Sequence, residues 1–150
     1  MSNLINEKLV KLNLNSKTRD EAIVELAKMI EAEDRLISYD EYIEEVFNRE
    51  EMSTTGIGLN IAIPHGKCDA VKTPTVALGR NKDGIEWESL DGEPVNIIFL
   101  LAVPSAGDGC NDHLRILAAI SRKLLHEEFT SKLHSCQSEK EMVELITSVI

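Results

Sequence analysis

The stretch VNIIFLLAVP, residues 95–104, is the longest apolar run in the chain and is interrupted only by Asn96. It consists of β-branched and large apolar residues without regular polar alternation, which is typical of a central strand buried on both faces. It is far shorter than the ~18 consecutive apolar residues of a membrane span. The run therefore predicts a sheet with both faces covered, and the rest of the fold is built outward from it.

Helices are predicted on both sides of this strand. Capping-box patterns, in which Ser or Thr is followed by Glu three residues later, occur at Thr18, Ser38 and Ser138. Each pattern precedes apolar residues at helical spacing, so a helix is expected to begin there. A loop rich in Gly, Ser and Asp follows the central strand, and Asp112 at its end is expected to cap another helix. One or two further helical turns are predicted at residues 127–133.

Shorter strands are predicted at residues 9–14, at residues 61–63, where Pro64 stops an apolar run, and at residues 75–79. A turn is expected at residues 81–84 because Asn, Asp and Gly favour turns. Two helices run consecutively near each end of the chain, so the order is not a strict alternation of strands and helices. The sequence therefore predicts an α/β fold with a mixed sheet sandwiched by helices.

The composition is that of one globular domain over residues 1–150, with 43% hydrophobic and 28% charged residues. The net charge of −10 argues against binding to nucleic acid or to anionic lipid. An acidic surface attracts a basic protein partner. The alternative interpretation is that the acidic surface only keeps the protein soluble. No segment has the pattern of a membrane span or a secretory signal, and three cysteines are too few for a disulfide framework. A cytoplasmic location is expected.

The segment with the clearest chemical signal is GIGLNIAIPHG, residues 56–66. It places His65 just beyond a predicted buried strand, between Pro64, which restricts the backbone, and Gly66, which permits close approach of other backbone. A neutral imidazole held in this way is a competent nucleophile near neutral pH. The pattern alone also fits an ordinary turn histidine, so the context has to decide.

Other candidate residues surround the same chemistry. His113 is expected at the start of a helix, where N–H groups and the helix dipole favour a phosphoryl group. Arg49 precedes Ser53, Thr54 and Thr55, a run of hydroxyl residues that could cradle phosphate oxygens. Taken alone, Arg49 is better interpreted as complementing the dipole at its own helix end. The remaining histidines at positions 126 and 134 are interpreted as surface residues.

Two motifs in this order resemble a known family. The block Glu50-x6-Ile57-Gly58-x2-Ile61-Ala62-Ile63-Pro64-His65-Gly66 resembles the signature of type-2 enzyme IIA domains, the fructose–mannitol family of the phosphoenolpyruvate-dependent sugar phosphotransferase system. The block from Asp112 to Arg122 resembles the family's second-histidine helix. The resemblance covers nearly all of the chain.

The resemblance implies a phosphotransferase component that needs no cofactor. His65 would accept a phosphoryl group on Nε2 from the histidine-containing phosphocarrier protein and pass it to the IIB component of a sugar permease. His113 would stabilise the transferring group, Arg49 would contact the phosphate, and Thr54 or Thr55 would supply a hydroxyl. The family's donor carries basic residues around its phosphohistidine, which gives the acidic surface a use. The pattern favours the fructose branch over the mannitol branch.

Two alternatives remain open. The pairs His65-x2-Cys68 and Cys110-x2-His113 could together close a tetrahedral zinc site. That site would use the same two histidines as the phosphoryl site, so the two interpretations exclude each other. The second alternative keeps the phosphoryl chemistry, because some relatives of these domains are regulatory phosphoproteins of the nitrogen type.

Overall fold

The computed structural model describes residues 4–105 and 108–148. Within them lies a six-stranded sheet with the order β1-β5-β6-β3-β2, and β4 also pairs with β6. The strands are β1 (Val10–Lys11), β2 (Gly56–Gly58), β3 (Ile61–Ala62), β4 (His65–Cys68), β5 (Thr75–Ile85) and β6 (Val95–Pro104). The pairs of β6 with β3 and β4 are parallel and its pair with β5 is antiparallel, so the predicted mixed sheet is confirmed.

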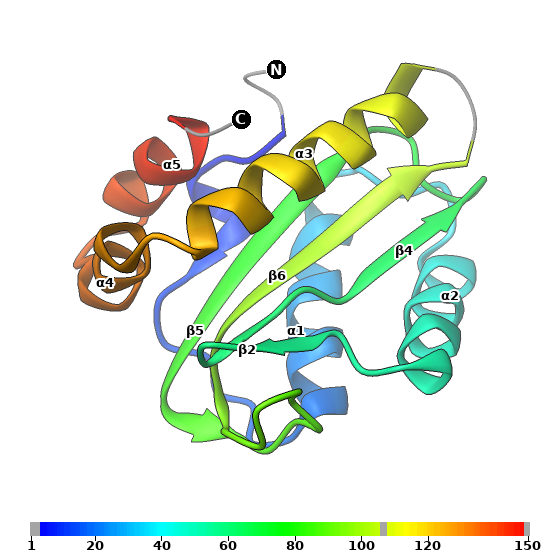
Figure 1. Ribbon diagram of the computed structural model, residues 1–150. Helices are drawn as coiled ribbons and strands as arrows, with labels where there is room; N and C mark the ends of the chain where they lie inside the picture. Colours follow the sequence, from blue (N-terminus) through cyan, green and yellow to red (C-terminus); the bar gives the residue numbers. More distant parts are fainter. Residues whose placement is uncertain (1–3, 106–107, 149–150) are drawn as a thin grey trace.

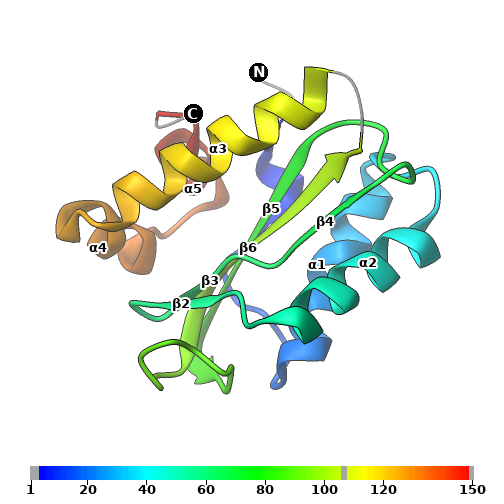
Figure 2. The ribbon, with the colours of Figure 1, turned by 45° about the vertical axis from the view of Figure 1, so that its right-hand side comes forward.

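Helices cover both faces of the sheet. They are α1 (Arg19–Ala32), α2 (Tyr39–Met52), α3 (Asp108–Leu124), α4 (Glu127–Ser135) and α5 (Glu139–Thr147), with a short 3₁₀ helix η1 (Glu7–Leu9) near the start. Figure 1 shows α3 crossing one face of the sheet with α1 behind it. Figure 2 shows the sheet between α3 on one side and α1 with α2 on the other. The central strand β6 is buried along almost its whole length, as its apolar run predicts.

The three capping boxes confirm the predicted helix starts. In each, the hydroxyl at the first position accepts a hydrogen bond from the backbone N–H three residues later, in Thr18–Glu21, Ser38–Glu41 and Ser138–Glu141. These bonds satisfy N–H groups that have no partner inside the helix. The local sequence therefore sets the points at which α1, α2 and α5 begin.

The turn predicted at residues 81–84 is wrong, because β5 continues through it to Ile85. Arg80 pairs with Ile97 and Ile85 pairs with Val95, so β5 carries extra residues relative to β6 and bulges. Gly84 has a φ of 84°, which a bulge accommodates as readily as a turn does. The first strand is also shorter than predicted, since η1 replaces its beginning and β1 ends at Lys11.

Helix α3 begins at Asp108, four residues before the predicted cap at Asp112. Both aspartates suit the start of a helix, where a negative charge is stabilised by the dipole, so local preference does not choose between them. As a result His113 lies inside the helix rather than at its first residue. Its side chain lies outside the described part of the structure.

Candidate functional site

His65 is the first residue of β4 and not part of a loop, which corrects the prediction. Ile61 of β3 pairs with Ile97 and His65 of β4 pairs with Leu101, so both strands keep one register along β6. β3 and β4 therefore run beside β6 as one strand that is interrupted at Pro64, which has no N–H to donate. The carbonyl of Pro64 still accepts a hydrogen bond from the N–H of Leu101 at 3.1 Å. The backbone of His65 is therefore held by the central strand.

The imidazole of His65 is half-buried and has a defined tautomer. Its Nδ1 lies 3.1 Å from the carbonyl oxygen of Ile63. A carbonyl oxygen only accepts, so Nδ1 carries the hydrogen and the neutral ring has its lone pair on Nε2. Burial lowers the pKa of His65, and the positive charge of Arg49 lowers it further, against the opposing effects of the Ile63 bond and of Glu50. The ring is thus biased toward its nucleophilic form.

This bias predicts a measurable difference in titration. The pKa of His65 in the folded protein is expected to lie below that of the same residue in the urea-unfolded chain, because burial penalises the charged ring. As pH falls, His65 should therefore keep its Nε2 lone pair to a lower pH than an exposed histidine. Proton NMR of the ring hydrogens measures both values. Arg49→Gln should raise the pKa of His65 in the folded protein. A pKa in the folded protein at or above that in the unfolded chain would contradict the conclusion that burial favours the neutral ring.

Gly66 lets β4 approach α2 closely. A Cβ at this position would lie 2.8 Å from Cγ2 of Val46 and 2.9 Å from Cε1 of Tyr42. The predicted close approach is therefore made by side chains of a helix, not by another backbone. The hydroxyl of Tyr42 donates to the carbonyl of Leu101 at 2.8 Å and ties α2 to the central strand. This packing brings the C-terminal end of α2, with Arg49, toward His65.

Arg49 lies in the last turn of α2 and is half-buried. Its guanidinium donates to the carbonyl oxygen of Ser53 at 2.9 Å and lies 3.3 Å from the Ser53 hydroxyl. The hydroxyl oxygen of Thr54 accepts from the N–H of Gly56 at 3.1 Å. The segment after α2 is thus organised by Arg49, and among the described residues the Thr54 hydroxyl accepts a hydrogen bond but donates none.

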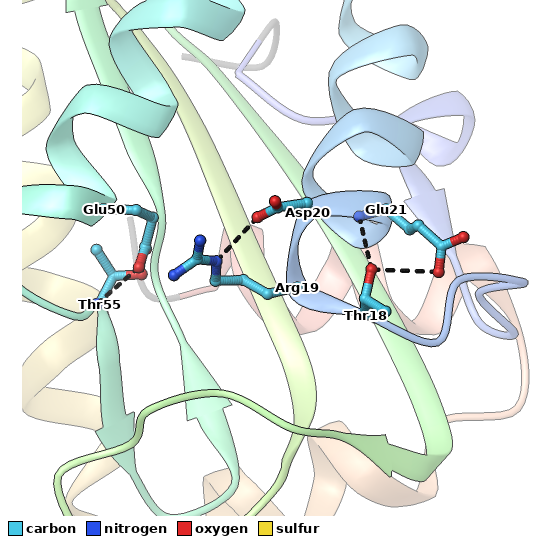
Figure 3. Close-up of polar contacts among 6 residues, drawn as sticks. All are labelled: Thr18, Arg19, Asp20, Glu21, Glu50 and Thr55. Carbon is cyan, nitrogen blue, oxygen red and sulfur yellow. Dashed lines mark hydrogen bonds and ion pairs between the residues drawn. The ribbon is translucent and has the colours of Figure 1, made fainter.

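Glu50 is a buried carboxylate to which the sequence motif assigned no role. It accepts from the hydroxyl of Thr55 and from its N–H, the latter at 3.4 Å (Figure 3). The carbonyl of Thr55 accepts from the N–H of Ile63 at 3.0 Å, and the carbonyl of Ile63 holds Nδ1 of His65. These contacts form one continuous chain from Glu50 to the imidazole. An acidic residue near a helix C-terminus opposes the dipole, and that was the signal for a specific partner.

The zinc alternative conflicts with the geometry of β4. His65 and Cys68 are three residues apart on one strand, so their side chains project from opposite faces of the sheet. Gly66, which shares a face with Cys68, is the residue packed against α2. One tetrahedral ion is therefore poorly placed to bind both. Among the residues that the structure describes, no group of three His, Cys, Asp or Glu side chains is arranged to hold a metal; Cys110 and His113 have side chains outside that part.

Comparison with known proteins shows the family of this chain. The family described as "Phosphoenolpyruvate-dependent sugar phosphotransferase system, EIIA 2" matches residues 3–149. The chain belongs to this family. As an EIIA 2 domain it is a phosphotransferase component. No helix in the described ranges is both long enough and apolar enough to cross a membrane.

Relatives of this EIIA 2 domain include transport and regulatory proteins. It is 36% identical over 142 residues to the fructose-specific EIIA component of Haloferax volcanii, covering 95% of this chain and 91% of that protein. It is 36% identical to the fructose-specific EIIABC component of Bacillus subtilis, covering 97% of this chain but only 23% of that protein. The crystal structure of nitrogen regulatory protein IIA-Ntr from Neisseria meningitidis superposes with a TM-score of 0.88 at 26% identity, covering 97% of each chain.

Proposed function

We propose that this domain is a cytoplasmic phosphoryl carrier of a sugar phosphotransferase system of the fructose type. It accepts a phosphoryl group on Nε2 of His65 from the histidine-containing phosphocarrier protein and passes it to the IIB component of a sugar permease. The observation that supports this most directly is the bond from Nδ1 of His65 to the Ile63 carbonyl. That bond places the lone pair of a rigidly held ring on Nε2, the nitrogen that the transfer needs.

The transfer is a displacement at phosphorus between two nitrogens. The Nε2 lone pair of His65 forms the new N–P bond as the N–P bond to the donor histidine breaks, and that electron pair returns to the donor ring. The N–H at Nδ1 donates its hydrogen bond to the Ile63 carbonyl throughout the transfer. This bond stabilises the positive charge that develops on the phosphorylated ring. Positioning and charge stabilisation carry most of such a reaction.

The neighbouring residues have distinct proposed roles. Arg49 supplies a positive charge for the phosphoryl oxygens from the end of α2. Thr54 is the better hydroxyl donor, because the hydroxyl hydrogen of Thr55 is already given to the buried Glu50. His113 belongs to α3, which covers the face of the sheet opposite α2, and His65 projects toward that face by strand alternation. This placement supports His113 as the residue that stabilises the transferring group.

The fructose preference rests on the relatives. Two fructose-specific proteins match at 36% identity over at least 95% of this chain. A regulatory role is the alternative, favoured by the IIA-Ntr superposition and by 29% identity to a nitrogen regulatory protein of Klebsiella oxytoca. Both alternatives use the same chemistry at His65 and differ in what receives the phosphoryl group.

The test is reconstitution. Incubation with phosphoenolpyruvate, enzyme I and the phosphocarrier protein is expected to add one acid-labile phosphoryl group, seen by intact-mass measurement. Omitting the phosphocarrier protein is the control and should give no gain. The phosphorylated domain is then mixed with a fructose-type IIB protein, and loss of the group to IIB within minutes supports transport. If the wild-type domain gained no phosphoryl group, the proposal would be wrong. If the phosphorylated domain did not transfer its group to IIB, the regulatory alternative would be favoured.

A further inference from the structure

Arg80 of β5 is a buried cation with an unusual set of partners. Its side chain is 6% exposed. Within the described ranges the guanidinium donates only to backbone carbonyls, those of Leu12 at 3.3 Å, Leu133 at 3.4 Å, His134 at 3.1 Å and Cys136 at 2.6 Å. No carboxylate of a described residue pairs with it. In this way the arginine fastens the C-terminal end of α4 to the sheet.

Carbonyl dipoles satisfy the hydrogen bonds of this guanidinium but supply no full negative charge. A buried charge usually has an ionic partner, because removing it from water is costly. The chain carries 26 acidic residues against 16 basic ones, so a carboxylate partner was widely available. Arg80 therefore lacks a carboxylate partner among the described residues because of how this part of the chain folds, and not because the chain has few carboxylates.

A cavity opens beside Arg80, with a volume of about 370 Å³. We call it the basic cavity; its lining residues are Asn60, Arg80, Asn81, Lys82, Asn96 and His134. An adjoining cavity of about 310 Å³ shares Arg80, Lys82 and His134. No described acidic residue lines either one. The nearby carboxylate of Glu141 accepts from the N–H of Gln137 at 3.4 Å and lines a different cavity.

The walls of the basic cavity are fixed by the amide side chains. Nδ2 of Asn60 donates to the carbonyl of Pro94 at 2.9 Å, and Nδ2 of Asn96 donates to the carbonyl of Asn81 at 2.8 Å. Asn81 in turn donates to the carbonyl of Ser16 at 2.8 Å. The polar lining is thus ordered before any ligand arrives, which lowers the entropic cost of binding.

We propose that the basic cavity binds a small phosphate monoester. Arg80 supplies a permanent buried positive charge, and Lys82 and His134 at the exposed rim supply further donors. A phosphate monoester carries close to two negative charges at neutral pH, which suits several cations better than one carboxylate would. The volume exceeds what bare phosphate needs, and the amide lining suits a polar organic group.

The basic cavity is separate from the phosphoryl site and does not depend on the proposed function. Arg80 pairs with Ile97 of β6, whereas His65 pairs with Leu101. The two positions are four residues apart along β6, or roughly 13 Å at about 3.3 Å per residue. A ligand held at Arg80 would therefore lie on its own part of the sheet. Burial and the charge of Arg80 lower the pKa of His134, and a bound dianion should raise it.

The test is an NMR titration of the full domain with glycerol 3-phosphate, against sodium chloride at matched ionic strength. Saturable shifts are expected at the amides of Asn60, Lys82 and Asn96, together with a raised pKa of His134. Lys82→Gln should weaken binding about tenfold, as loss of one charged contact does. Lys8→Gln, at an exposed lysine of η1, is the matched control and should leave the affinity unchanged.

Lys82 is exposed, so its replacement leaves the buried carbonyl contacts of Arg80 in place and the variant should fold. Shifts that sodium chloride reproduces would overturn the proposal. Equal affinity in wild type and Lys82→Gln would do the same, as would shifts confined to the surroundings of His65. Competition by inorganic phosphate at the same amides, with lower affinity than the ester, supports the proposed ligand class.

Discussion

Replacing His65 with asparagine is expected to abolish phosphoryl acceptance while leaving the fold intact. The asparagine Nδ2 can take the place of Nδ1 and keep the hydrogen bond to the Ile63 carbonyl. The variant has no counterpart of Nε2, so no atom remains to form the N–P bond. The expected loss of rate is at least about a thousandfold, because the nucleophile itself is removed.

The measurement is intact mass after incubation with the complete phosphorylating mixture, followed over time. The control is His126→Asn, since His126 is an exposed histidine that precedes α4 and has no part in the proposed site. That variant should gain one phosphoryl group at the wild-type rate. A His65→Asn protein that still gains an acid-labile group would mean that the acceptor is another histidine.

The parts of the fold that the sequence predicts well are determined locally. A capping box uses bonds between residues three positions apart, as in Thr18 and Glu21, so the pattern is visible without knowing the tertiary structure. The run from Val95 to Pro104 is apolar because both of its faces are covered, and that property also shows in composition alone. Both predictions are confirmed.

The parts that the sequence predicts poorly depend on distant partners. Strand β4 was missed because Pro64 looks like the end of a strand, whereas β6 holds one register on both sides of it. The bulge in β5 looked like a turn because both need residues that tolerate positive φ. Only the pairing with β6 tells the two apart.

The site shows the same division. His65 and Arg49 carry recognisable chemistry and stand in a recognisable motif. Glu50 stands in that motif too, but nothing in the motif indicates that its carboxylate is buried or that it accepts from Thr55. Arg80 bonds to carbonyls of Leu133 and Cys136, which lie 53 and 56 residues away in the chain, and no local pattern indicates such partners.

Replacing Glu50 with alanine is expected to destabilise the domain and to slow phosphoryl acceptance by His65. The side chain is 4% exposed and receives both the N–H and the hydroxyl of Thr55. Its removal leaves two buried donors without a partner, at a cost of roughly 2 to 4 kcal/mol in the free energy of unfolding. It also loosens the Thr55–Ile63 link that positions the ring of His65.

Glu50→Gln separates positioning from stability. The glutamine oxygen can still accept from the N–H of Thr55, and its NH2 group can donate to the Thr55 hydroxyl oxygen in place of the second carboxylate contact. Most of the free energy of unfolding should therefore return, as measured by urea denaturation. The negative charge of Glu50 raises the pKa of His65, so its loss should lower that pKa further. Glu51→Gln changes an exposed neighbour and should alter neither quantity. The charge of a carboxylate linked to the imidazole through Thr55 and Ile63 is expected to change the pKa of that ring. If Glu50→Gln left the pKa of His65 unchanged, Glu50 would contribute to stability alone.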